Sequence, residues 1–205
     1  MMDEAKAVKR AVRRQISKIE SLGDSGPGKA RLANLRKAVG KRPQDFPDLW
    51  GTFLEDLPEP EYETKSITPQ EEAVFNALTL YALAQQGNSP LTHSMNSEGI
   101  SFGAAAGKLT EGDEDEEERI RAKLKSLIAS KNTRELAEHL RRLIQLMKAK
   151  DIKLDYPELA EDIYWFHFPK ARENVQLKWA RDFIRTLRRE NAKKSEEKKN
   201  NQEEK

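Results

Sequence analysis

The sequence predicts an all-α fold, a helical bundle of about seven to nine helices with a disordered, charged C-terminal tail. Three observations predict it. Apolar residues recur at three- and four-residue spacing along most of the chain, which places them on one face of a helix. No segment shows the alternation of apolar and polar residues that is typical of a strand. Capping residues precede several of the periodic segments, and glycines or prolines separate others.

Two helices and one apolar cluster are expected in the first 57 residues. The helices span residues 3–22 and 29–39, and the glycine-rich segment 23–28 predicts a turn between them. A loop with two prolines precedes the apolar cluster in residues 48–57. The apolar faces of the two helices consist of Val8, Val12, Ile16, Ile19, Leu32, Leu35 and Val39. The apolar cluster consists of Leu49, Trp50, Phe53 and Leu54.

The most apolar helix is expected from Thr68 to about Gln86. Thr68 can cap it, Pro69 is tolerated at the first position, and the side chain of Glu71 can bond back to the cap. The run AVFNALTLYALA within this helix is apolar on every side, which predicts a central position in the core. Residues 100–109 predict a short helix whose small side chains let backbones approach closely.

Four further helices are expected in the C-terminal half, beginning at Arg119, Asn132, Asp155 and Ala171. Asn132 and Asp155 are each followed three residues later by a glutamate, which is a capping pair. The last helix runs to about residue 190, and the almost wholly polar residues 191–205 predict disorder. The buried positions expected here are Ile120, Leu124, Leu127, Ile128, Leu136, Leu140, Leu143, Ile144, Met147, Val175, Trp179, Phe183 and Leu187.

An acidic, proline-containing linker at residues 58–65 indicates how the chain is divided. We expect an N-terminal helical lobe over residues 1–60 and a C-terminal helical bundle over 67–190, followed by the tail 191–205. A single domain that includes both lobes remains an alternative.

Composition excludes several classes of protein. Charged residues are 35% of the chain and hydrophobic residues 37%, and there is no cysteine, which excludes disulfides, thiolate metal sites and a cysteine nucleophile. No apolar run approaches the roughly 20 residues that span a bilayer, and the N-terminus lacks the apolar core of a signal peptide. We therefore expect a cytoplasmic protein with no membrane partner.

Catalytic and metal-binding motifs are weak. The segment 23–30, GDSGPGKA, has the glycine and lysine spacing of a phosphate-binding loop, but Ala30 replaces the magnesium-binding hydroxyl and a helix precedes it. His93, His139 and His167 lie too far apart in sequence for a short-spaced metal motif. The acidic run 111–118 lacks the spacing of a calcium loop. We expect no enzyme, no metal and no cofactor.

The charge pattern indicates phosphate binding instead. Residues 119–150 carry 10 Lys or Arg and 2 Asp or Glu, a local excess of eight positive charges. Arg134, Arg141 and Lys148 recur every seven residues and form a basic ridge on one side of an amphipathic helix. Several such basic faces, on a chain without a catalytic motif, favour salt-sensitive contacts with a nucleic-acid backbone.

Four segments of the chain, spanning roughly residues 30–190, resemble the CasB family, the small subunit of the type I-E CRISPR complex Cascade. They are EEAVFNALTLYALAQQ, GISFGAAAGKL, ELAEHLRRLIQLMKAKDIKLDYPELAEDIYWF and VQLKWARDF. The resemblance implies a non-catalytic, all-helical subunit that holds target DNA, especially the displaced non-target strand, and so stabilises the R-loop. Its implied partners are the guide RNA, the repeated backbone subunits, the large subunit and a second copy of itself.

The candidate nucleic-acid-binding residues come from the ridge and from this resemblance. Arg141 and Arg142 match the family's LRRL arginines, and Ala104 stands where the family has an arginine that Lys108 could replace. The full set is Arg36, Lys37, Lys108, Arg119, Arg121, Lys123, Arg134, Arg141, Arg142 and Lys148.

Two alternatives to this function stay open. The chain could be a helical protein-interaction adapter whose basic surfaces contact acidic protein partners. A helix-turn-helix repressor is less favoured, because no short glycine-containing turn precedes a helix with base-reading side chains at its start.

Overall fold

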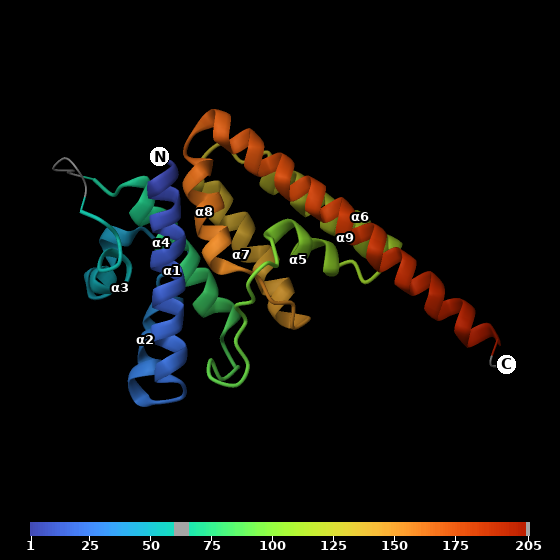
Figure 1. Cartoon of the computed structure of the whole chain (residues 1–205), viewed down its shortest axis with the longest axis horizontal. Helices are drawn as coiled ribbons and strands as arrows, with labels where there is room; N and C mark the ends of the chain where they lie inside the picture. The colour runs from blue at the N-terminus through green and yellow to red at the C-terminus, as the bar shows by residue number, and fades with distance from the viewer. Residues whose placement is uncertain (60–65, 204–205) are drawn as a thin grey trace.

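The computed structural model describes residues 1–59 and 66–203, with side-chain surroundings as far as residue 196. Over these residues the protein is all-helical, with nine α-helices, two short 3₁₀ helices and no strand (Figure 1). The predicted fold class is therefore confirmed. The elements are α1 (Met2–Leu22), α2 (Gly26–Lys37), η1 (Pro43–Asp45), η2 (Pro47–Leu49), α3 (Trp50–Leu54), α4 (Pro69–Ala84), α5 (Phe102–Lys108), α6 (Glu114–Ile128), α7 (Thr133–Ala149), α8 (Tyr156–Phe166) and α9 (Pro169–Glu203).

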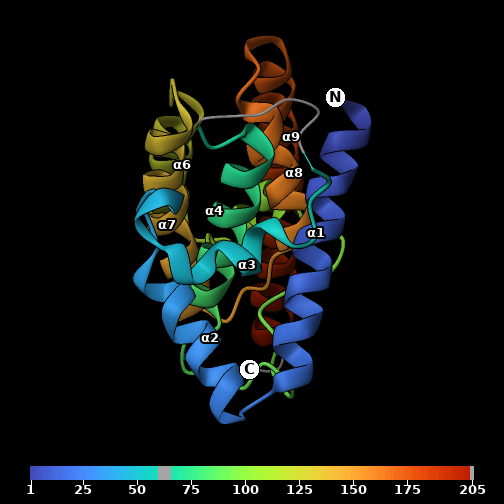
Figure 2. The same ribbon diagram turned by 90° about the vertical axis from the view of Figure 1, so that its left-hand side faces the viewer.

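Helix α4 forms the centre of the molecule, as its apolar sequence predicts. Figure 2 shows it surrounded by α1, α2, α3, α7 and α8, all of which contact it. Tyr81 of α4 packs edge-on against Tyr156 at 5.4 Å between ring centres, and Phe75 packs in the same way against Phe53. Because every side of α4 meets another helix, it has no polar face.

Side-chain caps fix the starts of the helices that frame the site. Thr68 and Glu71 form the predicted capping box, with bonds of 3.2 Å and 2.8 Å in the two directions. Asn132 accepts the amide of Glu135 at 2.9 Å at the start of α7, and Asp155 caps α8 in the same way. Each such cap contributes about 1 kcal/mol to helix stability.

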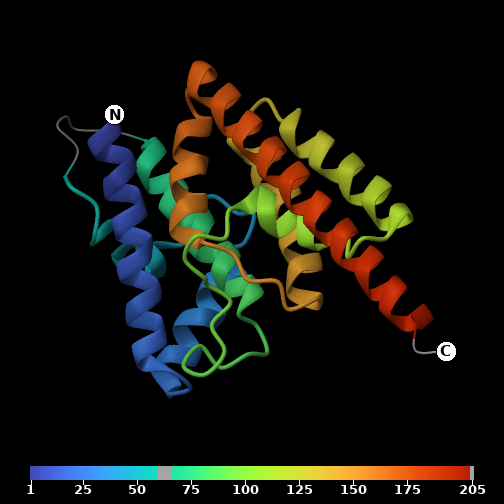
Figure 3. The same ribbon diagram turned by 45° about the vertical axis from the view of Figure 1, so that its right-hand side comes forward.

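The close approach predicted for the small residues of 100–109 occurs between α5 and α9. A Cβ on Gly103 would stand 2.2 Å from the backbone oxygen of Trp179, and one on Gly107 would stand 2.7 Å from the Cβ of Thr186. Only glycine fits at these contacts. Helix α9 therefore crosses α5 with its backbone in direct contact, and it runs beside α6 (Figure 3).

Three helix boundaries differ from those predicted. Helix α2 begins at Gly26, inside the predicted turn, because Ser25 accepts the amide of Gly28 and caps it. Helix α6 begins at Glu114, inside the acidic run, because carboxylates are stabilised in a first helical turn. Helix α9 continues to Glu203 rather than ending near 190, because lysine and glutamate are good helix formers.

The predicted division into two lobes is not decided by these helices. Most of the linker, residues 60–65, lies outside the described residues, as do residues 204–205 of the predicted tail. Buried apolar side chains from α1 through α9 form one connected cluster, and α1 contacts both α4 and α8. The lobe boundary therefore stays a prediction.

Candidate nucleic-acid interface

Helix α7 is the element on which most of the candidate residues depend. Its apolar face is buried as predicted, with the side chains of Leu136, Leu140, Leu143, Ile144 and Met147 each no more than 1% exposed. This burial fixes the rotation of the helix about its axis. The direction of each basic side chain of α7 is therefore fixed by the packing of the helix.

A basic groove of about 320 Å³ lies between α6 and α7. We call it the α6/α7 groove. Helix α6 lines it with Arg119, Ala122, Lys123 and Ser126, and α7 lines it with His139, Arg142 and Leu143. Arg119 also pairs with Glu116 of its own helix at 2.8 Å. Lys123 and Arg142 are exposed, and neither forms an ion pair with any described residue.

Arg121, another of the predicted nucleic-acid-binding residues, is directed away from this groove. Its guanidinium lies 5.6 Å from the ring centre of Phe183 on α9, and it forms an ion pair with Glu117. Positions 121 and 123 lie about 200° apart around a helix, so they cannot face the same groove. The structure assigns Arg121 to the packing of α6 on α9.

A second basic surface lies where α7 meets the end of α2. A Cβ on Gly40 would stand 4.0 Å from Nη1 of Arg141, which places this guanidinium beside the residues that follow α2. Lys37 is exposed on the last turn of α2, whereas Arg36 is half-buried and lines a separate hollow with Lys29, Gln85 and Asn88. We call Lys37 and Arg141 the α2/α7 surface.

The remaining candidates are distributed more widely. Lys148 donates to Oε1 of Gln86 at 3.1 Å, beside the end of α4, and Arg134 is exposed in the first turn of α7. Lys108 is exposed at the last residue of α5. Ala104 is only half-buried, and its amide bonds to the capping hydroxyl of Ser101 at 3.3 Å. The replacement of a family arginine by Lys108 stays a prediction.

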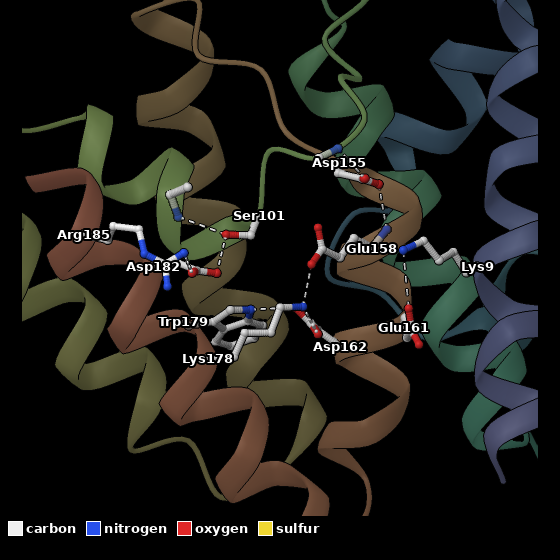
Figure 4. A network of polar contacts seen from close by, with 12 residues as sticks. Lys9, Ser101, Asp155, Glu158, Glu161, Asp162, Lys178, Trp179, Asp182 and Arg185 are labelled. Carbon is white, nitrogen blue, oxygen red and sulfur yellow. Dashed lines mark hydrogen bonds and ion pairs between the residues drawn. The ribbon is translucent and has the colours of Figure 1, made fainter. Parts of the chain in front are cut away.

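Lys178 of α9 forms ion pairs with α8 that the sequence analysis did not predict. Lys178 lies 2.7 Å from Glu158 and 2.8 Å from Asp162, and the indole of Trp179 donates to Asp162 at 2.7 Å (Figure 4). Burial raises the pKa of Asp162 to about 6, although both donors favour its charged form. Glu158 and Asp162 are four residues apart and therefore lie on one face of α8. This spacing is the sequence feature that could have indicated a cationic neighbour.

The three histidines lie in different surroundings. His139 lines the α6/α7 groove, and Nε2 of His93 contacts Asp151 at 2.6 Å. His167 is half-buried near Glu72, and burial lowers its pKa. Within the described ranges, no three His, Asp or Glu side chains are grouped so that they could hold a metal ion.

Comparison with known protein families decides where this chain belongs. The family model of the CRISPR-associated protein Cse2 matches residues 31–183, which include α3 through α8 and both basic surfaces. The chain belongs to the Cse2 family. This family is also named CasB, so the resemblance predicted from the sequence is confirmed, and the chain is a Cascade subunit.

Two solved CasB structures share this fold. The crystal structure of CasB from Thermobifida fusca has a TM-score of 0.71 and 28% identity, and the match covers 88% of this chain and 97% of that one. The structure of CasB from M. ruber has a TM-score of 0.63 and 21% identity, over 90% and 97% of the two chains. No curated protein sequence matches this Cse2 chain. None of the described helices is long and apolar enough to cross a membrane.

Proposed function

We propose that this Cse2 chain is a non-catalytic subunit that binds nucleic-acid backbone in the α6/α7 groove and thereby stabilises the target R-loop of Cascade. The observation that carries the proposal is the pair formed by Lys123 and Arg142. The two side chains project into one groove from two helices, and neither is neutralised by a described carboxylate. Cations in this arrangement attract phosphate groups.

The expected chemistry is sequence-independent. Lysine and arginine contacts with phosphate oxygens release counterions, and each neutralised phosphate adds about 0.9 to the slope of log affinity against log salt on duplex DNA. His139 at the same groove adds a further donor when protonated. The α2/α7 surface offers a separate set of cations, and Arg134, Lys148 and Lys108 lie outside both surfaces.

Modest contacts of this kind are sufficient for the proposed role. Opening a DNA duplex while forming an RNA–DNA duplex is a nearly balanced exchange, so a few kilocalories per mole from protein–backbone contacts can decide its outcome. The displaced non-target strand is the strand that needs such a partner. In this proposal the subunit also contacts the guide-RNA backbone subunits, the large subunit and a second copy of itself.

A matched pair of substitutions on α6 tests the proposal. Lys123→Glu reverses a charge inside the α6/α7 groove, whereas Lys125→Glu makes the same change at an exposed position of the same helix that does not line it. We expect Lys123→Glu to weaken R-loop formation by reconstituted Cascade roughly tenfold, with a smaller salt slope. Lys125→Glu should change it less than threefold. Equal effects of the two variants would reject the groove as the binding surface.

The adapter hypothesis predicts a different result in the same experiment. If the basic surfaces contact acidic proteins, Lys123→Glu should release the subunit from the complex before any DNA is added. The amount of subunit that co-purifies with the other components, measured before the R-loop assay, separates the two hypotheses.

A further inference from the structure

A second groove, of about 380 Å³, lies between α8 and α9. Only His167 and Phe168 connect the two helices, which diverge from this tight turn (Figure 1). We call it the α8/α9 groove, and it is lined by Glu161, Asp162, Trp165, Ala171, Asn174, Val175 and Lys178. None of these residues belongs to the basic surfaces.

The walls of this groove are apolar and fixed in position. Trp165 is half-buried, and its ring packs edge-on against Tyr164 at 5.1 Å and against Phe168 at 6.2 Å. Ala171 and Val175, one helical turn apart, line the groove from α9. A fixed indole with part of its surface free is a good platform for the aliphatic stem of a long side chain.

The polar end of the groove carries an excess of negative charge. The single ammonium of Lys178 is shared by Glu158 and Asp162, and Glu161 pairs with Lys9 at a longer distance of 3.5 Å (Figure 4). Three carboxylates therefore face two ammonium groups, which leaves one negative charge uncompensated. Asp162 is only 3% exposed, and burial raises its pKa to about 6, so an added cation would stabilise its ionised form.

We propose that the α8/α9 groove binds a basic segment of another Cascade subunit, in which a lysine or arginine stands beside an apolar residue. The aliphatic stem of the basic side chain packs on Trp165, and its charged end meets Glu161, the more exposed of the two carboxylates that line the groove. The apolar neighbour contacts Val175. A nucleic-acid backbone does not fit here, because the net charge of the groove repels phosphate.

The two grooves therefore suit partners of opposite charge, so binding at the α8/α9 groove is separate from nucleic-acid binding. The α6/α7 groove is cationic and suits a polyanion, whereas the α8/α9 groove is anionic and aromatic and suits a protein cation. Complementary charge of this kind fixes the orientation of a partner more than it adds affinity.

Two substitutions of Asn174 that introduce opposite charges test the proposal. It is exposed and lines the groove, so Asn174→Arg adds a cation and Asn174→Asp adds an anion without disturbing the core. Leu177→Arg is the matched control, because Leu177 is 47% exposed on the same helix but does not line the groove. Each variant is reconstituted with guide RNA and the other Cascade subunits, and its apparent affinity for the complex is measured by titration.

We expect Asn174→Arg to weaken incorporation about tenfold through like-charge repulsion, and Asn174→Asp to maintain or strengthen it. Leu177→Arg should change it less than twofold. The proposal is overturned if Asn174→Arg has no effect, if Leu177→Arg is equally harmful, or if the variant loses only the contact between two copies of this chain. Low-salt DNA gel shifts of the isolated subunit distinguish this result from failure of the nucleic-acid proposal, since Asn174→Arg should bind DNA normally.

Discussion

Arg141 and Arg142 are adjacent in sequence but belong to different surfaces of the protein. Arg142 lines the α6/α7 groove, whereas the guanidinium of Arg141 lies beside Gly40 at the end of α2. Successive residues of a helix are rotated by about 100°, and the buried face of α7 fixes where each of them points. The two arginines therefore lie in different places, although both belong to the LRRL segment that resembles the CasB family.

Separate charge reversals should show this separation. We expect Arg142→Glu to couple strongly with Lys123→Glu, because both residues face one groove, so the double variant should lose less than the sum of the two single losses. Arg141→Glu and Arg142→Glu should couple less strongly than this pair, because the two side chains have different surroundings. R-loop affinity at two salt concentrations measures all of these variants. Strong coupling between Arg141 and Arg142 would place them on one binding surface.

The ion pair between α8 and α9 should contribute to stability. Lys178→Met leaves the buried carboxylate of Asp162 with only the indole of Trp179 as a donor. Breaking a buried pair from one side costs about 3–5 kcal/mol, and we expect about 2 kcal/mol here because Lys178 is partly exposed. Urea denaturation at pH 7.5 measures the loss. The double variant Lys178→Met with Asp162→Asn is the control, and it should recover part of the stability.

The contact of α5 with α9 should not tolerate even one methyl group. Gly103→Ala would place its Cβ against the backbone of Trp179, which cannot move without displacing the helix, so we expect a loss of about 2–3 kcal/mol. Gly51→Ala is the control, because a Cβ on Gly51 meets nothing within 4 Å. Thermal unfolding compares the two variants, and similar melting temperatures would contradict the close packing.

His167 should make the protein less stable as the pH falls. Burial lowers the pKa of His167 below 6.5, so between pH 7 and pH 5 the unfolded chain takes up a proton at a higher pH than the folded chain. The stabilising effect is present above pH 6.5 and is lost on acidification.

His167→Gln removes this component. We expect the variant to lose less unfolding free energy between pH 7.5 and pH 5 than the natural chain does, in urea titrations at both pH values. The raised pKa of Asp162 acts in the opposite direction but is common to both proteins, so it cancels in the comparison. An unchanged pH dependence would mean that His167 is protonated equally well in the folded state.

Helix identity and burial could be predicted because both follow from local spacing and capping. The capping box of Thr68, the buried stripe of α7 and the small residues of α5 all occur as predicted. The predicted helix boundaries were wrong where charged residues or good helix formers extend a helix beyond its apolar stripe, as in α6 and α9.

The candidate site was only partly accessible from the sequence, because a basic residue can either bind a partner or neutralise a neighbour. Arg121, Lys178 and Lys123 are all basic residues on amphipathic helices, so the sequence does not distinguish them. In the structure Arg121 packs on Phe183, whereas Lys178 pairs with Glu158 and Asp162. Those roles depend on which helices become neighbours, and this is a property of the tertiary fold. Residues of α6 and α7 form one groove for the same reason.

Helix α9 has 35 residues and is about 52 Å long, at 1.5 Å per residue. Gly107 contacts it at Thr186, and the turn after α5 contacts it again, because a Cβ on Gly112 would stand 3.0 Å from the backbone oxygen of Glu190 and Lys194 pairs with Asp113 at 3.4 Å. Nine further residues extend about 13 Å beyond Lys194 to Glu203. A tilt of about 10° at Lys194 would displace the far end by only about 2 Å. The glycines of α5 and the turn that follows them thus set the direction in which the end of α9 leaves the bundle.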